Sequence, residues 1–171
     1  MTEKQEYALD KIISKLPEEN KQTFRDVAEY AISLGYMPVI KGNETYADFT
    51  KSKTKRTILK IYASYKPPCI GIKFYAIPEY GGVFKEALEA SVKNHYRLNY
   101  EIKPHCTGCM QRRNGRCNEP QGYTIVLPDG KQGFLCGFGI VPLLSFTVEN
   151  VQEVKEALKL QDEFFMKQIS K

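Results

Sequence analysis

The stretch TILKIYASYKPPCIGIKFYA, residues 57–76, carries the clearest strand pattern in the chain. Two prolines divide it into segments 57–64 and 69–76, and apolar residues recur at every second position of each segment. Because successive side chains of a strand point to opposite faces, this alternation predicts two strands that each bury one face. The two apolar rows are Leu59, Ile61 and Ala63, then Ile70, Ile72, Phe74 and Ala76.

Helical periodicity and strand alternation predict the elements on either side of this stretch. The expected helices span residues 5–15, 17–34, 81–95 and 148–169. Further strands are expected over 45–51, 123–127 and 132–138. This order predicts an α+β fold with one antiparallel sheet of about five strands and helices packed on one face. No linker or repeat divides the chain, so residues 1–171 are expected to form a single domain.

Composition is that of a folded domain. The chain has 171 residues, 42% of them hydrophobic and 26% charged, with a net charge of +5. That length is enough for one substantial core. No apolar run approaches the roughly 20 residues that span a bilayer, and the first residues lack the features of a secretory signal. We therefore expect a cytoplasmic protein without a membrane partner.

Four of the five cysteines have the spacing of a metal site. Cys106, Cys109, Cys117 and Cys136 form the pattern C-x2-C-x7-C-x18-C. In a reducing compartment such clusters more often bind metal than form disulfides. Four thiolates suit tetrahedral zinc and leave no open position for water, so the pattern predicts a structural zinc site, a zinc-knuckle loop within about residues 104–138.

The remote Cys136 is expected to return to the other three through a hairpin. If Asp129 and Gly130 form a two-residue turn, Tyr123 lies opposite Cys136 near the start of the hairpin. A slip of one residue would turn Cys136 to the other face. The convergence of the four sulfurs therefore depends on this register.

Other interpretations of the cysteine segment stay open. His105 can replace one cysteine ligand, the thiols can be unliganded, or Cys106 and Cys109 can form a redox pair. A deaminase-type catalytic zinc is excluded, since that site needs an H-x-E half and Arg97 stands where the glutamate should be.

Basic residues gather in two places. Residues 49–78 contain seven lysines and arginines and no acid. The first cluster is the predicted turn with Lys51, Lys53, Lys55 and Arg56, and the second is Arg112, Arg113 and Arg116 inside the cysteine segment. A lysine-rich turn is often only solvated, and the arginines can offset thiolate charge at zinc. Alternatively, both clusters bind nucleic-acid phosphates.

The polar side of the opening strands is a candidate ligand face. The alternation places Tyr62, Tyr75 and Cys69 opposite the apolar rows. If no helix covers this face, it is a tyrosine-lined surface for a small molecule or a peptide. The alternative is an ordinary second face that loops partly cover.

The front half resembles small bacterial α+β domains of the YdhG type, which are described as frataxin-like. The matching features are Leu16-Pro17-Glu18, the run from Leu34 to Pro38 that leads into three strands, and the helix near Phe84. They cover about residues 7–95, and the cysteine segment departs from the pattern. The resemblance implies a fold, and no functional residue is carried over from it.

These observations favour a non-enzymatic, zinc-stapled binding domain with a small-molecule or peptide ligand, and a regulatory role is one option. A nucleic-acid-associated protein that uses the two basic clusters is the alternative. An enzyme that uses the thiol of Cys69 or an incompletely closed zinc site is a third possibility.

Overall fold

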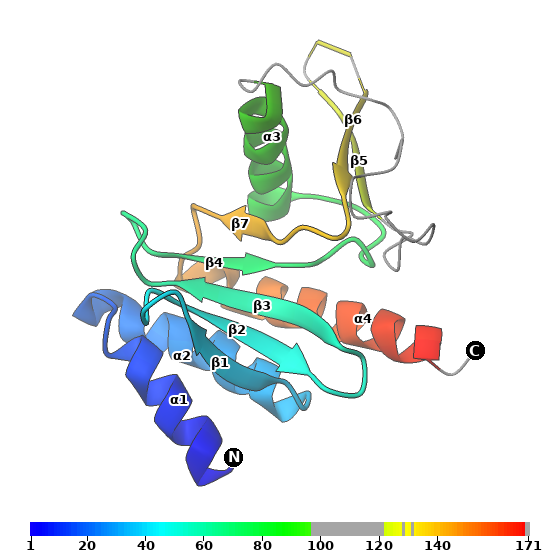
Figure 1. The fold of residues 1–171 in the computed structure, drawn as a ribbon. Coiled ribbons are helices and arrows are strands. Elements are labelled where there is room, and N and C mark those ends of the chain that lie inside the picture. Colours follow the sequence, from blue (N-terminus) through cyan, green and yellow to red (C-terminus); the bar gives the residue numbers. More distant parts are fainter. Residues whose placement is uncertain (97–121, 128, 131, 170–171) are drawn as a thin grey trace.

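The computed structural model describes residues 1–96, 122–127, 129–130 and 132–169, with the side chains of 95 and 96 excepted (Figure 1). These residues form four α-helices, a five-stranded antiparallel sheet and a separate two-stranded hairpin. The predicted α+β class is therefore confirmed.

The elements follow one another along the chain with short connections. The helices are α1 (Glu3–Ile13), α2 (Glu18–Ser33), α3 (Gly82–Tyr96) and α4 (Val151–Ile169), the last preceded by the 3-10 turn η2 (Val148–Asn150). The strands are β1 (Met37–Lys41), β2 (Tyr46–Lys51), β3 (Arg56–Tyr62), β4 (Cys69–Ile72), β5 (Gly122–Val126), β6 (Gln132–Cys136) and β7 (Val141–Leu143). None of the helices described has the length and apolarity that crossing a bilayer requires.

The main sheet has the strand order β1-β2-β3-β4-β7. Phe49 pairs with Leu59 and Ile61 with Ile70, so the predicted apolar rows align across three strands. These side chains are fully buried, and α2 and α4 both contact β3. Figure 1 shows these two helices behind the sheet. Burial of this shared row is the main force that holds the strands and helices together.

Two strands of the sheet were not expected, and two expected strands lie outside it. β1 contains Pro38, which lacks a backbone N–H and is tolerated here because β1 is an edge strand. β7 has only three residues, too few to show an alternation. Because β7 occupies the free edge of β4, the β5–β6 hairpin forms its own sheet beside α3 (Figure 1).

Strand β4 ends at Ile72, four residues earlier than predicted. The next residues turn instead, and the backbone N–H of Ile77 donates to the carbonyl of Phe74 at 3.1 Å. The N–H of Phe74 donates to the hydroxyl oxygen of Tyr123 at 3.0 Å, which joins this turn to the hairpin. The alternation past residue 72 therefore reflects packing in a turn and does not mark a strand.

Candidate functional site

A cavity of about 390 Å³ lies beside the main sheet, between the β2–β3 turn and the turn that follows β6. Its lining is Lys55, Arg56, Thr57, Lys60, Tyr62, Lys73, Phe138, Gly139 and Ile140. Among these described residues four are basic and none is acidic. The cavity therefore combines a concave shape with an excess of positive charge.

A β-bulge in β3 helps to build this lining. Phe49 pairs with Leu59, but the next residue of β2, Thr50, pairs with Thr57, which leaves Ile58 without an opposite residue. An extra residue of this kind reverses the alternation beyond it. The bulge therefore turns Thr57 to the same face as Lys60, where its hydroxyl lies 3.1 Å from that of Thr50.

Lys55 lines the cavity from a turn in which its own backbone is strained. Its φ of 54° lies in the left-handed region, which non-glycine residues occupy at a cost of roughly 1–2 kcal/mol. Its backbone N–H donates to the carbonyl of Lys51 at 2.8 Å, which fixes this conformation. Residues with strained backbone conformations occur often at binding sites, where contacts with the surrounding structure stabilise them.

Two of the cations that line the cavity pack against aromatic rings. Lys73 directly follows β4 and is only 4% exposed. Its Nζ lies 5.9 Å from the ring centres of both Phe138 and Phe165, and Cζ of Arg56 lies 6.0 Å from the ring of Phe165. The negative ring faces attract these charges and help to hold them in place.

The remaining wall comes from the turn after β6. The N–H of Phe138 donates to Sγ of Cys136 at 3.4 Å, and the N–H of Gly139 donates to its carbonyl at 3.1 Å. Ile140 then reaches strand β4 at Gly71, where an added Cβ would lie 2.5 Å from Cγ2 of Ile140. A glycine is therefore required at this contact.

The predicted ligand face is partly assembled next to the cavity. Tyr62 pairs with Cys69, so the two share a face, and the ring of Tyr62 stacks on that of Tyr65 at 4.8 Å. Tyr46 lies on the same face, 6.2 Å from Tyr62 between ring centres. Nζ of Lys60 lies 5.1 Å from the ring of Tyr46. An aromatic and basic surface therefore continues outward from the cavity.

Tyr75 does not belong to this face, contrary to the prediction. It follows the end of β4, where the strand alternation no longer applies, and it is 8% exposed. Its ring packs against those of Tyr123, Phe164 and Phe165. Tyr75 is therefore a core residue.

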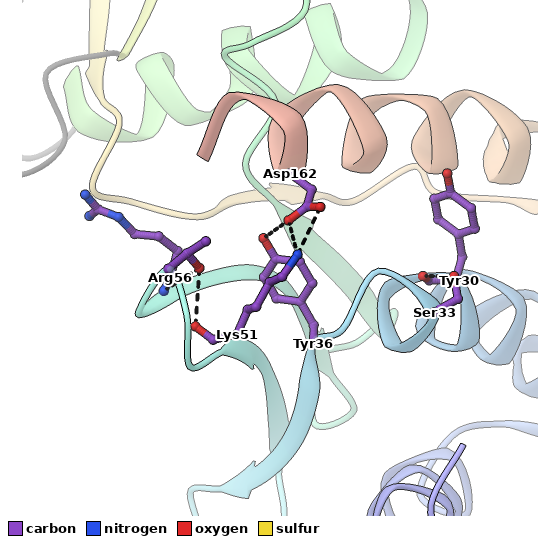
Figure 2. A network of polar contacts seen from close by, with 7 residues as sticks. Tyr30, Ser33, Tyr36, Lys51, Arg56 and Asp162 are labelled. Carbon is purple, nitrogen blue, oxygen red and sulfur yellow. Dashed lines mark hydrogen bonds and ion pairs between the residues drawn. The ribbon is translucent and has the colours of Figure 1, made fainter. Parts of the chain in front are cut away.

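The predicted basic turn is divided between two roles. Lys55 and Arg56 line the cavity, and Lys53 is exposed. Lys51 instead points to the helix side, where its Nζ lies 2.8 and 3.1 Å from the carboxylate oxygens of Asp162 (Figure 2). It therefore helps to attach α4 to the sheet and is not part of a solvent-facing cluster.

Tyr36 completes this contact between sheet and helix. Its hydroxyl donates to the Asp162 carboxylate at 2.9 Å, and Nζ of Lys51 lies 5.2 Å from its ring (Figure 2). Burial, and then the charge of Asp162, raise the pKa of the Tyr36 hydroxyl. Tyr36 therefore remains a neutral donor.

Cys69 is fully buried, and burial raises the pKa of its thiol to about 11. Because the thiolate is the nucleophile, we expect iodoacetamide at neutral pH to modify Cys69 at least about a hundredfold more slowly than a free cysteine. Peptide mapping by mass spectrometry measures this rate, with urea-unfolded protein as the control. Rapid modification in the native protein would contradict the expectation and favour a catalytic thiol.

The hairpin register differs by one residue from the prediction. Cys136 pairs with Gly122, and Tyr123 pairs with Leu135. Val126 pairs with Gln132, so the loop between them has five residues, an odd number. In the predicted hairpin with a two-residue turn, the number of residues between any two paired positions is even. A shift of one residue exchanges the faces of a strand, so Cys136 is half-buried on the outer face.

Most of the expected metal site lies outside the described residues. Cys106, Cys109, Cys117 and the alternative ligand His105 all belong to that part of the chain, as do Arg112, Arg113 and Arg116. Within the described residues no three His, Cys, Asp or Glu side chains are grouped as metal ligands. Cys136 is the one predicted ligand that the structure describes.

The sequence interpretation missed several lining residues. Lys60 and Lys73 belong to the region of residues 49–78 that has basic residues and no acidic residue. Their positions in the structure depend on the β-bulge in β3 and on the early end of β4. Phe138 and Ile140 show no sequence signal, because their role depends on a turn that meets a distant strand.

Comparisons with protein-family models, with curated proteins and with solved structures found no match. The resemblance of residues 7–95 to YdhG-type domains therefore stays a prediction.

Proposed function

We propose that this chain is a binding domain that holds a small anionic ligand in the cavity beside the main sheet. The observation that carries the proposal is the lining itself, with four basic residues and no acidic residue among those described. Concave sites with a few convergent polar groups are the usual form of small-molecule sites.

The basic residues offer two kinds of contact to an anion. The planar guanidinium of Arg56 suits two parallel hydrogen bonds to a phosphate or carboxylate, while the lysines act as point charges. Lys60 also forms a 3.0 Å ion pair with Asp48, so its charge is shared with a carboxylate. The arrangement favours a ligand with more than one negative charge.

Lys55→Asn separates binding from folding. Asparagine tolerates the left-handed conformation of residue 55 better than lysine, so we expect unchanged or slightly higher thermal stability. Loss of one partly exposed charge should weaken pyrophosphate binding about fivefold, which corresponds to ~1 kcal/mol. Calorimetric titration and thermal unfolding measure the two effects.

Lys53→Asn is the matched control, because Lys53 lies in the same turn and is exposed but does not line the cavity. It should leave pyrophosphate affinity unchanged. Equal losses in both variants would show that general surface charge, and not the cavity, attracts the anion. No measurable binding by the parent protein would refute the proposed function.

Nucleic-acid binding remains the second candidate function. The observation in its favour is the aromatic surface of Tyr46, Tyr62 and Tyr65 next to Lys60, since single strands stack on such rings. The engagement of Lys51 with Asp162 weakens it, because that lysine is directed away from solvent. Affinity for mixed single-stranded DNA that falls steeply with added salt would support it.

We also propose that Cys136 joins Cys106, Cys109 and Cys117 at a structural zinc ion. Although the hairpin register differs from the predicted one, Cys136 still lies opposite Gly122, the first described residue after the segment with the other three cysteines. Its sulfur accepts a hydrogen bond from the N–H of Phe138, and contacts of this kind orient metal ligands.

Metal analysis tests this second proposal. We expect a single zinc ion per chain in the purified protein, and a chelator should lower the Tm by at least about 5 °C. Cys136→Ser should lose the zinc, whereas Cys69→Ala, which changes a cysteine outside the predicted set, should retain it. Metal-free parent protein with the same Tm as the purified form would contradict the structural role.

A further inference from the structure

The cavity lining contains two chemically different sets of residues. The β2–β3 turn and the start of β3 contribute Lys55, Arg56 and the hydroxyl of Thr57. The turn after β6 contributes the apolar side chains of Phe138 and Ile140, and β3 adds the ring of Tyr62. A ligand that contacts both sets of residues must carry an anionic group and an apolar or planar group.

Phe138 is the residue that identifies the second group. Its side chain is 55% exposed, although the residue lies in a turn fixed by two hydrogen bonds to Cys136. An exposed aromatic ring at the edge of a cationic cavity offers a flat surface for stacking. Nζ of Lys73, 5.9 Å from its ring centre, connects this surface to the charged lining.

From this arrangement we infer that the ligand is a nucleoside phosphate, with its phosphate near Lys55 and Arg56 and its base stacked on Phe138. The inference rests on the proposed function and adds the ligand class. A cavity of about 390 Å³ falls in the range of small-molecule sites. The four basic residues surround one cavity, whereas a polymer site needs cations that follow a strand.

Calorimetric titration with AMP, ribose 5-phosphate, inorganic phosphate and adenosine tests the inference. AMP should bind about tenfold more tightly than ribose 5-phosphate, since base stacking on one aromatic ring contributes about that factor. Phe138→Ala should remove this advantage, so that the variant binds AMP and ribose 5-phosphate with equal affinity. Phe138→Tyr should restore it, because the planar ring is retained.

Tyr7→Ala is the control for loss of an exposed aromatic residue, since Tyr7 is 69% exposed in α1 and does not line the cavity. It should bind AMP like the parent protein. If AMP and ribose 5-phosphate bind equally well, the nucleoside inference is overturned while anion binding stands. If no phosphate compound binds, both fail. Tighter, strongly salt-dependent binding of an oligonucleotide would overturn the mononucleotide in favour of a polymer.

Discussion

Asp162→Ala is expected to lower the free energy of unfolding by about 3 kcal/mol, the lower end of the cost of breaking a buried ion pair. The carboxylate accepts hydrogen bonds from Lys51 and Tyr36, and the side chains of Lys51 and Asp162 are only 15% and 13% exposed. Removal of Asp162 leaves an ammonium group and a hydroxyl without their acceptor in a mostly dry place. Urea unfolding followed by circular dichroism measures the loss.

Two further variants show whether the ion pair is the cause. Glu163→Ala changes the exposed neighbour on α4 and should alter stability by less than about 0.5 kcal/mol. The double variant Lys51→Met with Asp162→Leu replaces both charges by apolar groups and should recover most of the loss. Equal destabilisation by the double and the single variant would instead indicate that α4 requires the charged pair.

Tyr123→Ala is expected to cost about 3–5 kcal/mol, the range for deletion of a large buried aromatic side chain. Tyr123 is fully buried, and its ring centre lies 4.8 Å from that of Phe74 and 5.6 Å from that of Tyr75. Because it belongs to β5, these contacts fasten the hairpin to the turn after β4. The variant should therefore loosen the hairpin and the adjacent cavity wall, and urea unfolding measures the loss of stability.

Tyr123→Phe distinguishes the hydroxyl from the ring. It keeps the aromatic packing but leaves the N–H of Phe74 without its acceptor, and should cost about 1–3 kcal/mol. Val126→Ala, in the same strand but 63% exposed, is the control and should have little effect. A Tyr123→Ala protein as stable as the parent would show that the hairpin is held mainly by other contacts.

Much of the secondary structure follows from local patterns. The alternation in residues 57–64 and 69–76 predicted β3 and the start of β4, and the helical periods predicted all four helices. These patterns succeed because each element must bury one face, and burial imposes its period on the sequence. Strand β1 was not predicted, because it contains Pro38, a residue that argues against a strand. Strand β7 was not predicted, because its three residues are too few to show an alternation.

The candidate site was predicted only in part. Lys55, Arg56 and Tyr62 were named from charge and alternation, and all three line the cavity. Tyr75 and Lys51 were also assigned to binding surfaces. Tyr75 instead packs in the core against Tyr123, and Lys51 forms an ion pair with Asp162 of α4. Alternation of apolar residues predicts the two faces of a strand, but it does not predict the residue at which the strand ends.

The sequence by itself determined the α+β class, the helices, the central strands and the excess of basic residues around β3, since these depend on local periodicity and composition. The tertiary structure alone decided which basic residues come together around the cavity. One unpaired residue in β3 and a one-residue difference in the hairpin register change which side chains face which surface. The physical reason is that the side-chain period of a strand is two, so a single residue reverses a face, and contacts between distant segments fix that residue.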